Sequence, residues 1–498
     1  MLRLPTLYAD LAARLDALAA DASAVDASRR VVDAALADGE TYYGINTGFG
    51  ALARQRIGPD ALDALQENLL LSHAVGLGVP VPEPVARLML GLKVHALGRG
   101  FSGVSRAVFD RLLLMARRGL VPVVPSRGSL GASGDLAPLA HLALPLIGRG
   151  EVWRAGQPAP AADVLAAEGL APVRLRAKDG LALINGTQFM AAYGAYVLER
   201  AGRLARTADL VAAMSLEALQ GSARPFDARI QDVRPHPGQA AVAENVRRLL
   251  AGSEILESHR HCGKVQDPYS LRCVPQIHGA SRDALAHAAA VVEREINSVT
   301  DNPLVFQEGS PAIVSGGNFH GQPLALAMDY AALALAEFAS VAERRLYLLL
   351  EGHDGLPVFL MRETGVNSGF MMPQYTAAAL VSENKVLSHP ASVDSIPSSR
   401  GQEDHVSMGS ISAVKLYQVM ENAERVLGLE LMAAAQALDF RAPLRPGRGV
   451  EAAHAFVRSR VTHREADADF AADMARCIEA VAEGALLAAA EAETGLLV

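Results

Sequence analysis

Apolar residues recur at helical spacing along most of this chain. From Leu7 to Leu36 they return at the period of one helix face, until Gly39 interrupts the pattern. Residues 60–120 repeat the pattern with breaks at glycine and proline. Four longer amphipathic segments follow, at 188–221, 281–299, 323–351 and 408–440. Segments of this length and period predict long helices packed into a bundle, so we expect a mainly α protein.

The segment from Pro323 to Glu351 is apolar on almost every side, with Asp329 and Glu337 among its few early interruptions. A helix of this kind is buried on most sides. No stretch of the chain reaches the ~20 uncharged apolar residues of a membrane span. Burial is then most easily achieved at the centre of a multi-helix bundle or within a subunit interface. We therefore expect an oligomer.

The first part of the chain has shorter elements and more loops. Between Ile147 and Ala182, glycines and prolines interrupt a weak alternating pattern around Val152, which predicts short strands. No repeat, low-complexity tail or charge block separates this part from the long helices. We therefore expect one continuous globular unit, with a loop-rich N-terminal region over 1–190 and a long-helix bundle over 191–498.

Composition narrows the class of protein. Half of the residues are apolar but only 5% are aromatic, so the core is built from Ala, Leu and Val, which favours helices in close contact. The net charge of −8 argues against a nucleic-acid surface and points to a small-molecule ligand. Charged residues interrupt the N-terminal apolar runs, which predicts a cytoplasmic protein without a signal peptide. The three cysteines are too widely spaced for a disulfide framework or a CxxC metal site.

The triplet Ala132, Ser133 and Gly134 carries the most unusual chemical possibility. Its side chains are minimal, so the amide nitrogen of Gly134 could reach the carbonyl carbon of Ala132 and close a five-membered ring. Loss of two waters, one of them from the Ser133 hydroxyl, would leave a carbon electrophile at Ser133. The simpler alternative is a loop before a helix that Ser133 or Asp135 caps.

Seven motifs in loops between the helices have more functional side chains than turns require. They are YGINTGFG (Tyr43–Gly50), GASGDLAPLAH (Gly131–His141), QDPYSLRC (Gln266–Cys273), DNPLVF (Asp301–Phe306), SGGNFH (Ser315–His320), VNSGFM (Val366–Met371) and QEDHVSM (Gln402–Met408). In this order they resemble the aromatic amino acid ammonia-lyases, above all the histidine-specific members, nearly end to end. The resemblance implies the long-helix bundle of the ammonia-lyase and fumarase-like type.

In that family the triplet cyclises without another enzyme. The resemblance therefore implies a 4-methylidene-imidazol-5-one formed from Ala132, Ser133 and Gly134, with no external cofactor and no metal. The electrophile can take up the substrate amine or, in a competing proposal, its aromatic ring. The resemblance also makes Tyr43 the base at the substrate β-carbon, although its ordinary pKa of ~10 must be lowered for that task.

Other site residues follow from the same resemblance. Arg272 binds the substrate carboxylate by a two-pronged hydrogen bond. Tyr269 supports the electrophile or transfers protons, and Asn185 donates hydrogen bonds to the ring carbonyl or the substrate. Three further residues are expected to line the substrate site, namely Gln266, Phe319 and Gln402. Read singly, each of these residues has an ordinary structural explanation, such as a helix cap or a turn aromatic.

Substrate identity depends on His73 and Glu403 together. Ser72 and His73 resemble the pair found in histidine-specific members, and Glu403 stands where the phenylalanine and tyrosine enzymes have an amide. A histidine and a catalytic carboxylate offer polar partners to both nitrogens of an imidazole, whereas a phenyl ring prefers an apolar wall. We therefore expect deamination of L-histidine to trans-urocanate by a homotetramer whose sites are shared between subunits.

Two positions depart from the family pattern. Arg400 stands where histidine enzymes commonly have alanine, and Gln322 where many have glutamate. Arg400 would disfavour a cationic imidazolium if it pointed into the pocket, and would change nothing if it pointed to an adjoining subunit.

Alternatives of other classes fit less well. A serine hydrolase would need GxSxG, and the sequence has GASGD around Ser133. The sequence contains no HExxH motif that would indicate metal catalysis. His259, His261 and Cys262 do not have the spacing of metal ligands, and we expect them to be exposed. A non-catalytic scaffold would be expected to lack the triplet or Tyr43. A tyrosine or phenylalanine ammonia-lyase, or an aminomutase with the same electrophile, remains open.

Overall fold

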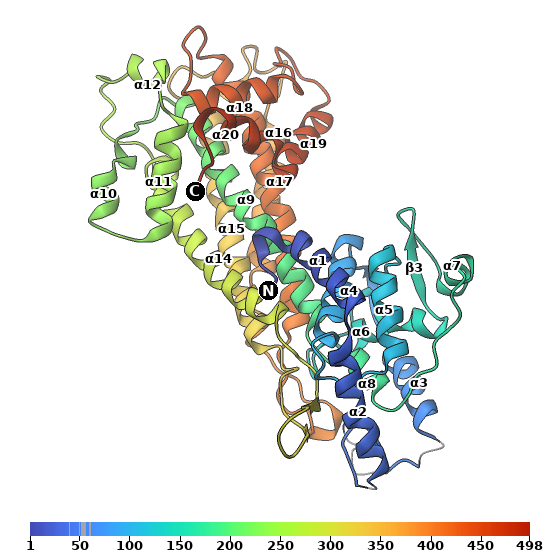
Figure 1. Cartoon of the computed structure of the whole chain (residues 1–498). Coiled ribbons are helices and arrows are strands. Elements are labelled where there is room, and N and C mark those ends of the chain that lie inside the picture. The colour runs from blue at the N-terminus through green and yellow to red at the C-terminus, as the bar shows by residue number, and fades with distance from the viewer. Residues whose placement is uncertain (39, 49, 51–55, 59–60) are drawn as a thin grey trace. The chain divides into compact units, whose positions relative to one another are not determined.

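The computed structural model describes residues 1–38, 40–48, 50, 56–58 and 61–498. It is mainly helical, which confirms the predicted fold class (Figure 1). The chain divides into two compact units. The first comprises Met1–Tyr196, Ala289–Asp329 and Pro390–Val414, and the second Val197–Ala288, Tyr330–His389 and Lys415–Val498. The predicted division at residue 190 stays a prediction.

The first unit contains the shorter elements. Its helices are α1 (Leu7–Ala20), α2 (Ser23–Ala37), α3 (Leu62–His73), α4 (Glu83–Leu97), α5 (Arg106–Arg118), α6 (Leu136–Ala143), α7 (Ala161–Ala167) and α8 (Asp179–Ile184). Among the described residues, three antiparallel strand pairs accompany them: β1 (Leu77–Pro80) with β2 (Pro125–Arg127), β3 (Glu151–Arg154) with β4 (Gln157–Pro160), and β5 (Leu304–Val305) with β6 (Ile313–Val314). The predicted short strands near Val152 are confirmed as the β3–β4 hairpin, and α1, α4 and α5 pack side by side (Figure 1).

The long helices contribute residues to both units. They are α9 (Gln188–Ala218), α14 (Val274–Ile296), α15 (Gln322–Leu350) and α17 (Gly409–Asp439). The second unit adds α10 (Ala228–Asp232), α11 (Pro237–Leu249), α12 (Glu254–Ser258), α13 (Tyr269–Arg272), α16 (Met371–Leu387), α18 (Arg448–Arg458), α19 (Phe470–Glu483) and α20 (Ala485–Thr494). The four predicted amphipathic segments correspond to the four long helices, with boundaries that differ most at α14.

Alanine allows the long helices to approach closely. On α15 and α17, buried positions are filled largely by alanine and leucine, among them Ala331, Ala342 and Ala434. Among the described residues, α15 alone is long and apolar enough to cross a membrane, but 67% of its most apolar window is buried. That burial is typical of a core helix in a soluble protein, as the sequence predicts for this segment.

A layer of buried charges joins the four long helices within the second unit. Arg345 of α15 donates two hydrogen bonds to Glu430 of α17, at 2.6 and 2.9 Å, and both side chains are fully buried. Arg345 also lies 3.5 Å from Nε2 of His278 on α14, whose Nδ1 donates to Asp209 of α9 at 2.7 Å. Ser215 of α9 donates to Glu430 at 2.7 Å. Burial lowers the pKa of His278, so the ring is neutral. The ring lies between Asp209 on one side and Arg345 on the other.

Candidate active site

The predicted electrophile triplet lies in the first unit, in the loop that leads into α6. Gly134 has a left-handed backbone, with φ of 76°, and bridges to Gly186 in a parallel arrangement. The Gly186 N–H lies 3.4 Å from the Ser133 carbonyl, and the Asp135 N–H donates to the Gly186 carbonyl at 2.7 Å. A Cβ on Gly134 would collide with the Gly186 carbonyl oxygen. The segment at Gly186 therefore braces the triplet so closely that only glycine fits at position 134.

A second segment braces the other side of the same loop. Just before and within the first turn of α17, the Met408 N–H donates to the Leu130 carbonyl at 3.1 Å, and the Ser410 hydroxyl donates to the Ser129 carbonyl at 2.5 Å. The two braces hold a loop of small residues in one bent conformation. A tightly bent backbone is what attack of the Gly134 nitrogen on the Ala132 carbonyl requires, so the residues present fit the ring closure predicted for them.

Asp135 is fully buried directly after the triplet. Its carboxylate accepts the Met190 N–H at 3.0 Å and lies 3.5 Å from the Ser129 hydroxyl. Burial raises the pKa of Asp135 to about 7. A carboxyl group with this pKa can hold or release a proton near neutrality, within one residue of the reacting amides. The sequence suggested only a helix cap here, and the Asp135 side chain makes no capping bond to α6.

Asn185 is buried at the C-terminal end of α8. Its side-chain amide donates to the Asn302 carbonyl at 3.2 Å, and among the described residues its Oδ1 has no partner.

The backbone carbonyl of Asn185 accepts a hydrogen bond from the ammonium of Lys93 on α4, at 2.6 Å. Burial lowers the pKa of Lys93 to about 7, against the nearby charges of Asp301 and Asp135, which raise it. Sequence reasoning missed Lys93, whose only signal is a cation inside the apolar run of α4.

Tyr43 lies half-buried in the loop after α2. Its hydroxyl accepts the Gly50 N–H at 3.3 Å. Phe49 of the same motif lies outside the described residues. The Ser399 side chain packs against Gly50, so that a Cβ on this glycine would lie 2.6 Å from the Ser399 hydroxyl oxygen. The loop of the predicted base thus touches the segment that precedes Glu403.

His73 and Glu403 lie within electrostatic range of each other. Burial lowers the pKa of His73, whereas the negative charge of Glu403 raises it. His73 closes α3, where its Nδ1 lies 3.0 Å from the Ser72 hydroxyl. Glu403 accepts a hydrogen bond from the Ser398 hydroxyl at 2.5 Å. The charge of Glu403 therefore acts on His73, although 330 positions separate the two residues in the sequence.

The remaining predicted residues of this unit lie in two loops that touch. His320 packs edge-to-face on His405, with ring centroids 5.9 Å apart, and its Nε2 lies 3.3 Å from the His405 carbonyl. Phe319 is half-buried beside His320, and Gln402 is exposed. Of the two departures from the family pattern, Arg400 is exposed, and Gln322 has a buried Oε1 without a partner among the described residues.

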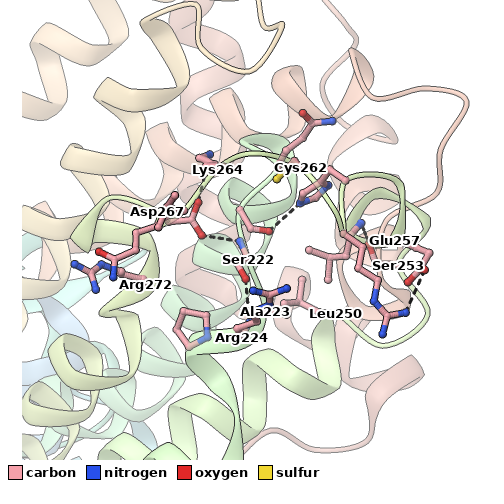
Figure 2. A pocket seen from close by; sticks show the side chains of 18 of the residues that line it. Ser222, Ala223, Arg224, Leu250, Ser253, Glu257, Cys262, Lys264, Asp267 and Arg272 are labelled. Carbon is pink, nitrogen blue, oxygen red and sulfur yellow. Dashed lines mark hydrogen bonds and ion pairs between the residues drawn. The ribbon is translucent and has the colours of Figure 1, made fainter.

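The motif that begins at Gln266 belongs to the second unit, where its Asp267 and Arg272 line a pocket (Figure 2). Arg272 stacks over the Tyr269 ring at 4.6 Å, while Tyr269 is 69% exposed and Gln266 is exposed. Arg272 and Gln266 line a hollow of about 930 Å³. Within the described part of the chain, Nε of Arg272 is buried without a partner. Such a guanidinium is suited to receive a carboxylate.

Neighbouring contacts fix the loop that precedes Arg272. Asp267 is buried and accepts the Ser222 N–H at 2.6 Å, and Lys264 forms ion pairs with Asp267 and Asp354 at 3.3 and 3.0 Å. His261 and Cys262 are exposed, as expected. His259 is half-buried instead, because its two ring nitrogens lie against the carbonyls of Ile255 and Gly221, at 2.7 and 3.2 Å. No group of three or more metal-ligating side chains occurs among the residues that the structure describes.

Comparison with known proteins identifies the class. Residues 8–459 match the aromatic amino acid lyase family, and the chain belongs to that family. It is 55% identical to the histidine ammonia-lyase of Sorangium cellulosum, over 95% of this chain and 93% of that protein. The predicted resemblance to histidine ammonia-lyases is confirmed.

Two solved structures extend the comparison to the fold. The histidine ammonia-lyase of Trypanosoma cruzi superposes with a TM-score of 0.88 at 41% identity, covering 95% of this chain and 89% of that one. The tyrosine aminomutase of Streptomyces globisporus superposes with a TM-score of 0.90 at 38% identity, covering 96% and 95%. The ammonia-lyase fold is therefore confirmed. Because an aminomutase fits equally well, the fold alone does not select the substrate.

Proposed function

We propose that this enzyme deaminates L-histidine to trans-urocanate and ammonia. The observation that carries the proposal is that His73 and Glu403 lie within electrostatic range of each other, so that an imidazole and a carboxylate can meet the two ring nitrogens of the substrate. A phenol or phenyl ring would leave at least one of these polar groups unpaired. The identity of 55% to a histidine ammonia-lyase supports the same substrate.

The electrophile of the proposed reaction is the methylidene-imidazolone formed from Ala132, Ser133 and Gly134. The braced loop, with glycine required at position 134, supports its formation. When formed, the group supplies a carbon electrophile that no unmodified side chain offers. We expect the wild-type protein to be lighter than its sequence by two waters in intact-mass spectrometry, and Ser133→Ala to have the mass of its sequence. A wild-type mass equal to that of the sequence would contradict the modification.

The protein residues divide the remaining tasks. Tyr43 takes the proton from the substrate β-carbon, and Arg272 binds the carboxylate with its free guanidinium edge. Tyr269 and Asn185 hold the reacting atoms by hydrogen bonds, and Glu403 binds the imidazole as well as acting in catalysis. Gln266, Phe319 and Gln402 line the substrate. Breaking the Cβ–H and Cα–N bonds then leaves the double bond of the unsaturated acid and releases ammonia.

We further propose a cytoplasmic homotetramer whose active sites combine residues of different subunits. Exposed apolar side chains on α15 and α16 in the second unit support association, among them Tyr330, Leu333 and Tyr375, which are 48%, 48% and 55% exposed. Co-expression of Ser133→Ala with Arg272→Ala tests shared sites. Mixed tetramers can then assemble some sites with an intact triplet and an intact Arg272, so part of the activity returns. No recovery in mixed tetramers isolated by two affinity tags would contradict shared sites.

The substrate is tested by incubating the purified protein with histidine, tyrosine and phenylalanine in parallel. Each unsaturated acid is followed by its ultraviolet absorbance, and chromatography separates it from any β-amino acid. We expect urocanate from histidine and little turnover of the other two. A preference for tyrosine or phenylalanine would contradict the substrate, and a β-amino product would indicate an aminomutase.

A further inference from the structure

Residues 398–403 form a small closed loop at the end of the site that we propose binds the imidazole. The Ser398 N–H donates to the Glu403 carbonyl at 3.0 Å, and the Glu403 N–H lies 3.4 Å from the Ser398 carbonyl. Between them, Ser399, Arg400 and Gly401 all have left-handed backbones, with φ of 49°, 57° and 84°. Side chains disfavour this region at the first two of these positions, so the loop depends on the bonds that close it.

The Ser398 side chain adds a third closing bond, and this one reaches the functional carboxylate. Its hydroxyl donates to Oε2 of Glu403 at 2.5 Å. Within the described residues, Oε1 of the same carboxylate has no hydrogen-bond partner. The serine thus engages one oxygen and leaves the other to a ligand. Without this bond, a half-buried glutamate with three rotatable bonds would turn toward water instead of keeping one position beside His73.

We infer that Ser398 is a positioning residue that fixes the Glu403 carboxylate beside His73 and so sets the preference for an imidazole over a phenol. The inference rests on the proposed function. Selectivity for a ring N–H requires an acceptor at a defined place, because a mobile carboxylate must be ordered again each time the substrate binds. Ser398 orders it in advance. Since the serine touches the carboxylate and no reacting atom, its effect is larger on binding of the ring than on the chemical step in which Glu403 takes part.

The test compares Ser398→Ala with Ser398→Thr, which keeps the hydroxyl, and with the control Ser395→Ala. Ser395 lies in the same segment, but its hydroxyl contacts the Val406 N–H and His405 and not Glu403. We expect Ser398→Ala to raise KM for histidine about ten-fold, the fold-change typical of a lost hydrogen bond to a charged group, with a smaller fall in kcat. The ratio of kcat/KM for histidine to that for tyrosine falls accordingly. Ser398→Thr and Ser395→Ala keep wild-type values.

A double-mutant cycle separates positioning from a general loss of structure. If Ser398 acts through the carboxylate charge, Ser398→Ala has little further effect in a Glu403→Gln background. Additive effects, or an unchanged KM in Ser398→Ala, would overturn the inference. Ser398→Cys retains the side-chain size with a weak donor and replaces the alanine variant should that one fail to fold. A wild-type preference for tyrosine would contradict the proposed function itself, whereas an unaffected Ser398→Ala on a histidine-preferring enzyme contradicts only this inference.

Discussion

Replacing the buried Lys93 with methionine should change how stability depends on pH. In the folded protein, burial lowers the pKa of this ammonium from 10.5 to about 7, so the unfolded chain holds the proton more tightly. Stability therefore rises with pH between these two values, at about 1.4 kcal/mol per pH unit for one group. Across the whole window the gain is about 5 kcal/mol. Below pH 7 the folded state carries the full cost of a buried charge.

Methionine removes this titration while keeping a similar shape. It also leaves the Asn185 carbonyl without its donor, which costs about 1–3 kcal/mol at every pH. The free energy of unfolding of wild type minus that of Lys93→Met should therefore increase steadily from pH 7 to pH 10. Other groups titrate in both proteins and largely cancel in this difference.

The assay is equilibrium urea unfolding, followed by circular dichroism at fixed ionic strength and protein concentration over pH 6–10. Lys93→Arg serves as the control that retains a cation and cannot lose its proton in this range. A difference between wild type and Lys93→Met that stays flat from pH 7 to pH 10 would show that Lys93 is not held in a desolvated environment. A difference that falls as the pH rises would contradict the predicted direction of the Lys93 pKa shift.

Two further predictions test the loop and the core. Gly186→Ala should disturb the contacts between residue 186 and the triplet, because Gly186 has a φ of 124° and an added Cβ would lie 2.5 Å from Oε1 of Gln188 and 2.8 Å from the Thr300 hydroxyl. Intact-mass spectrometry should then show chains that keep both waters. A fully dehydrated variant would refute this prediction. Arg345→Met should lower the free energy of unfolding by about 3–5 kcal/mol, because Glu430 is left buried without its cation. Urea unfolding at neutral pH measures the loss, and Arg294→Met, at an exposed arginine of α14, is the control.

The sequence predicts local features of this protein better than its long-range contacts. Helical periodicity predicts α15 and α17 within a residue or two, because an apolar stripe needs no knowledge of its partner. It places the start of α14 seven residues late, since Val274–Ala280 lacks a clear stripe. The sequence predicts the triplet because its three reacting residues are adjacent, whereas its brace at Gly186 depends on a pairing between distant segments.

Lys93 and Ser398 show why part of the site could not be predicted. Lys93 stands in an apolar run, where a lysine usually extends its ammonium to water, and only the fold shows that it meets the Asn185 carbonyl. Ser398 lies outside the QEDHVSM motif, so its bond to Glu403 depends on the closed turn between them. The roles assigned to Tyr43, Arg272 and the other site residues stay predictions that the proposed variants test.

The charged layer in the second unit has a consequence for how the long helices align. Surfaces built from alanine and leucine look much alike at every turn, so apolar packing alone would tolerate a slide of one helix along another by one turn, about 5.4 Å. Sliding α15 would separate Arg345 from Glu430, and sliding α14 would separate His278 from Asp209, so either movement would break buried polar contacts. The charged layer therefore fixes the axial register of four helices whose apolar surfaces are otherwise uniform.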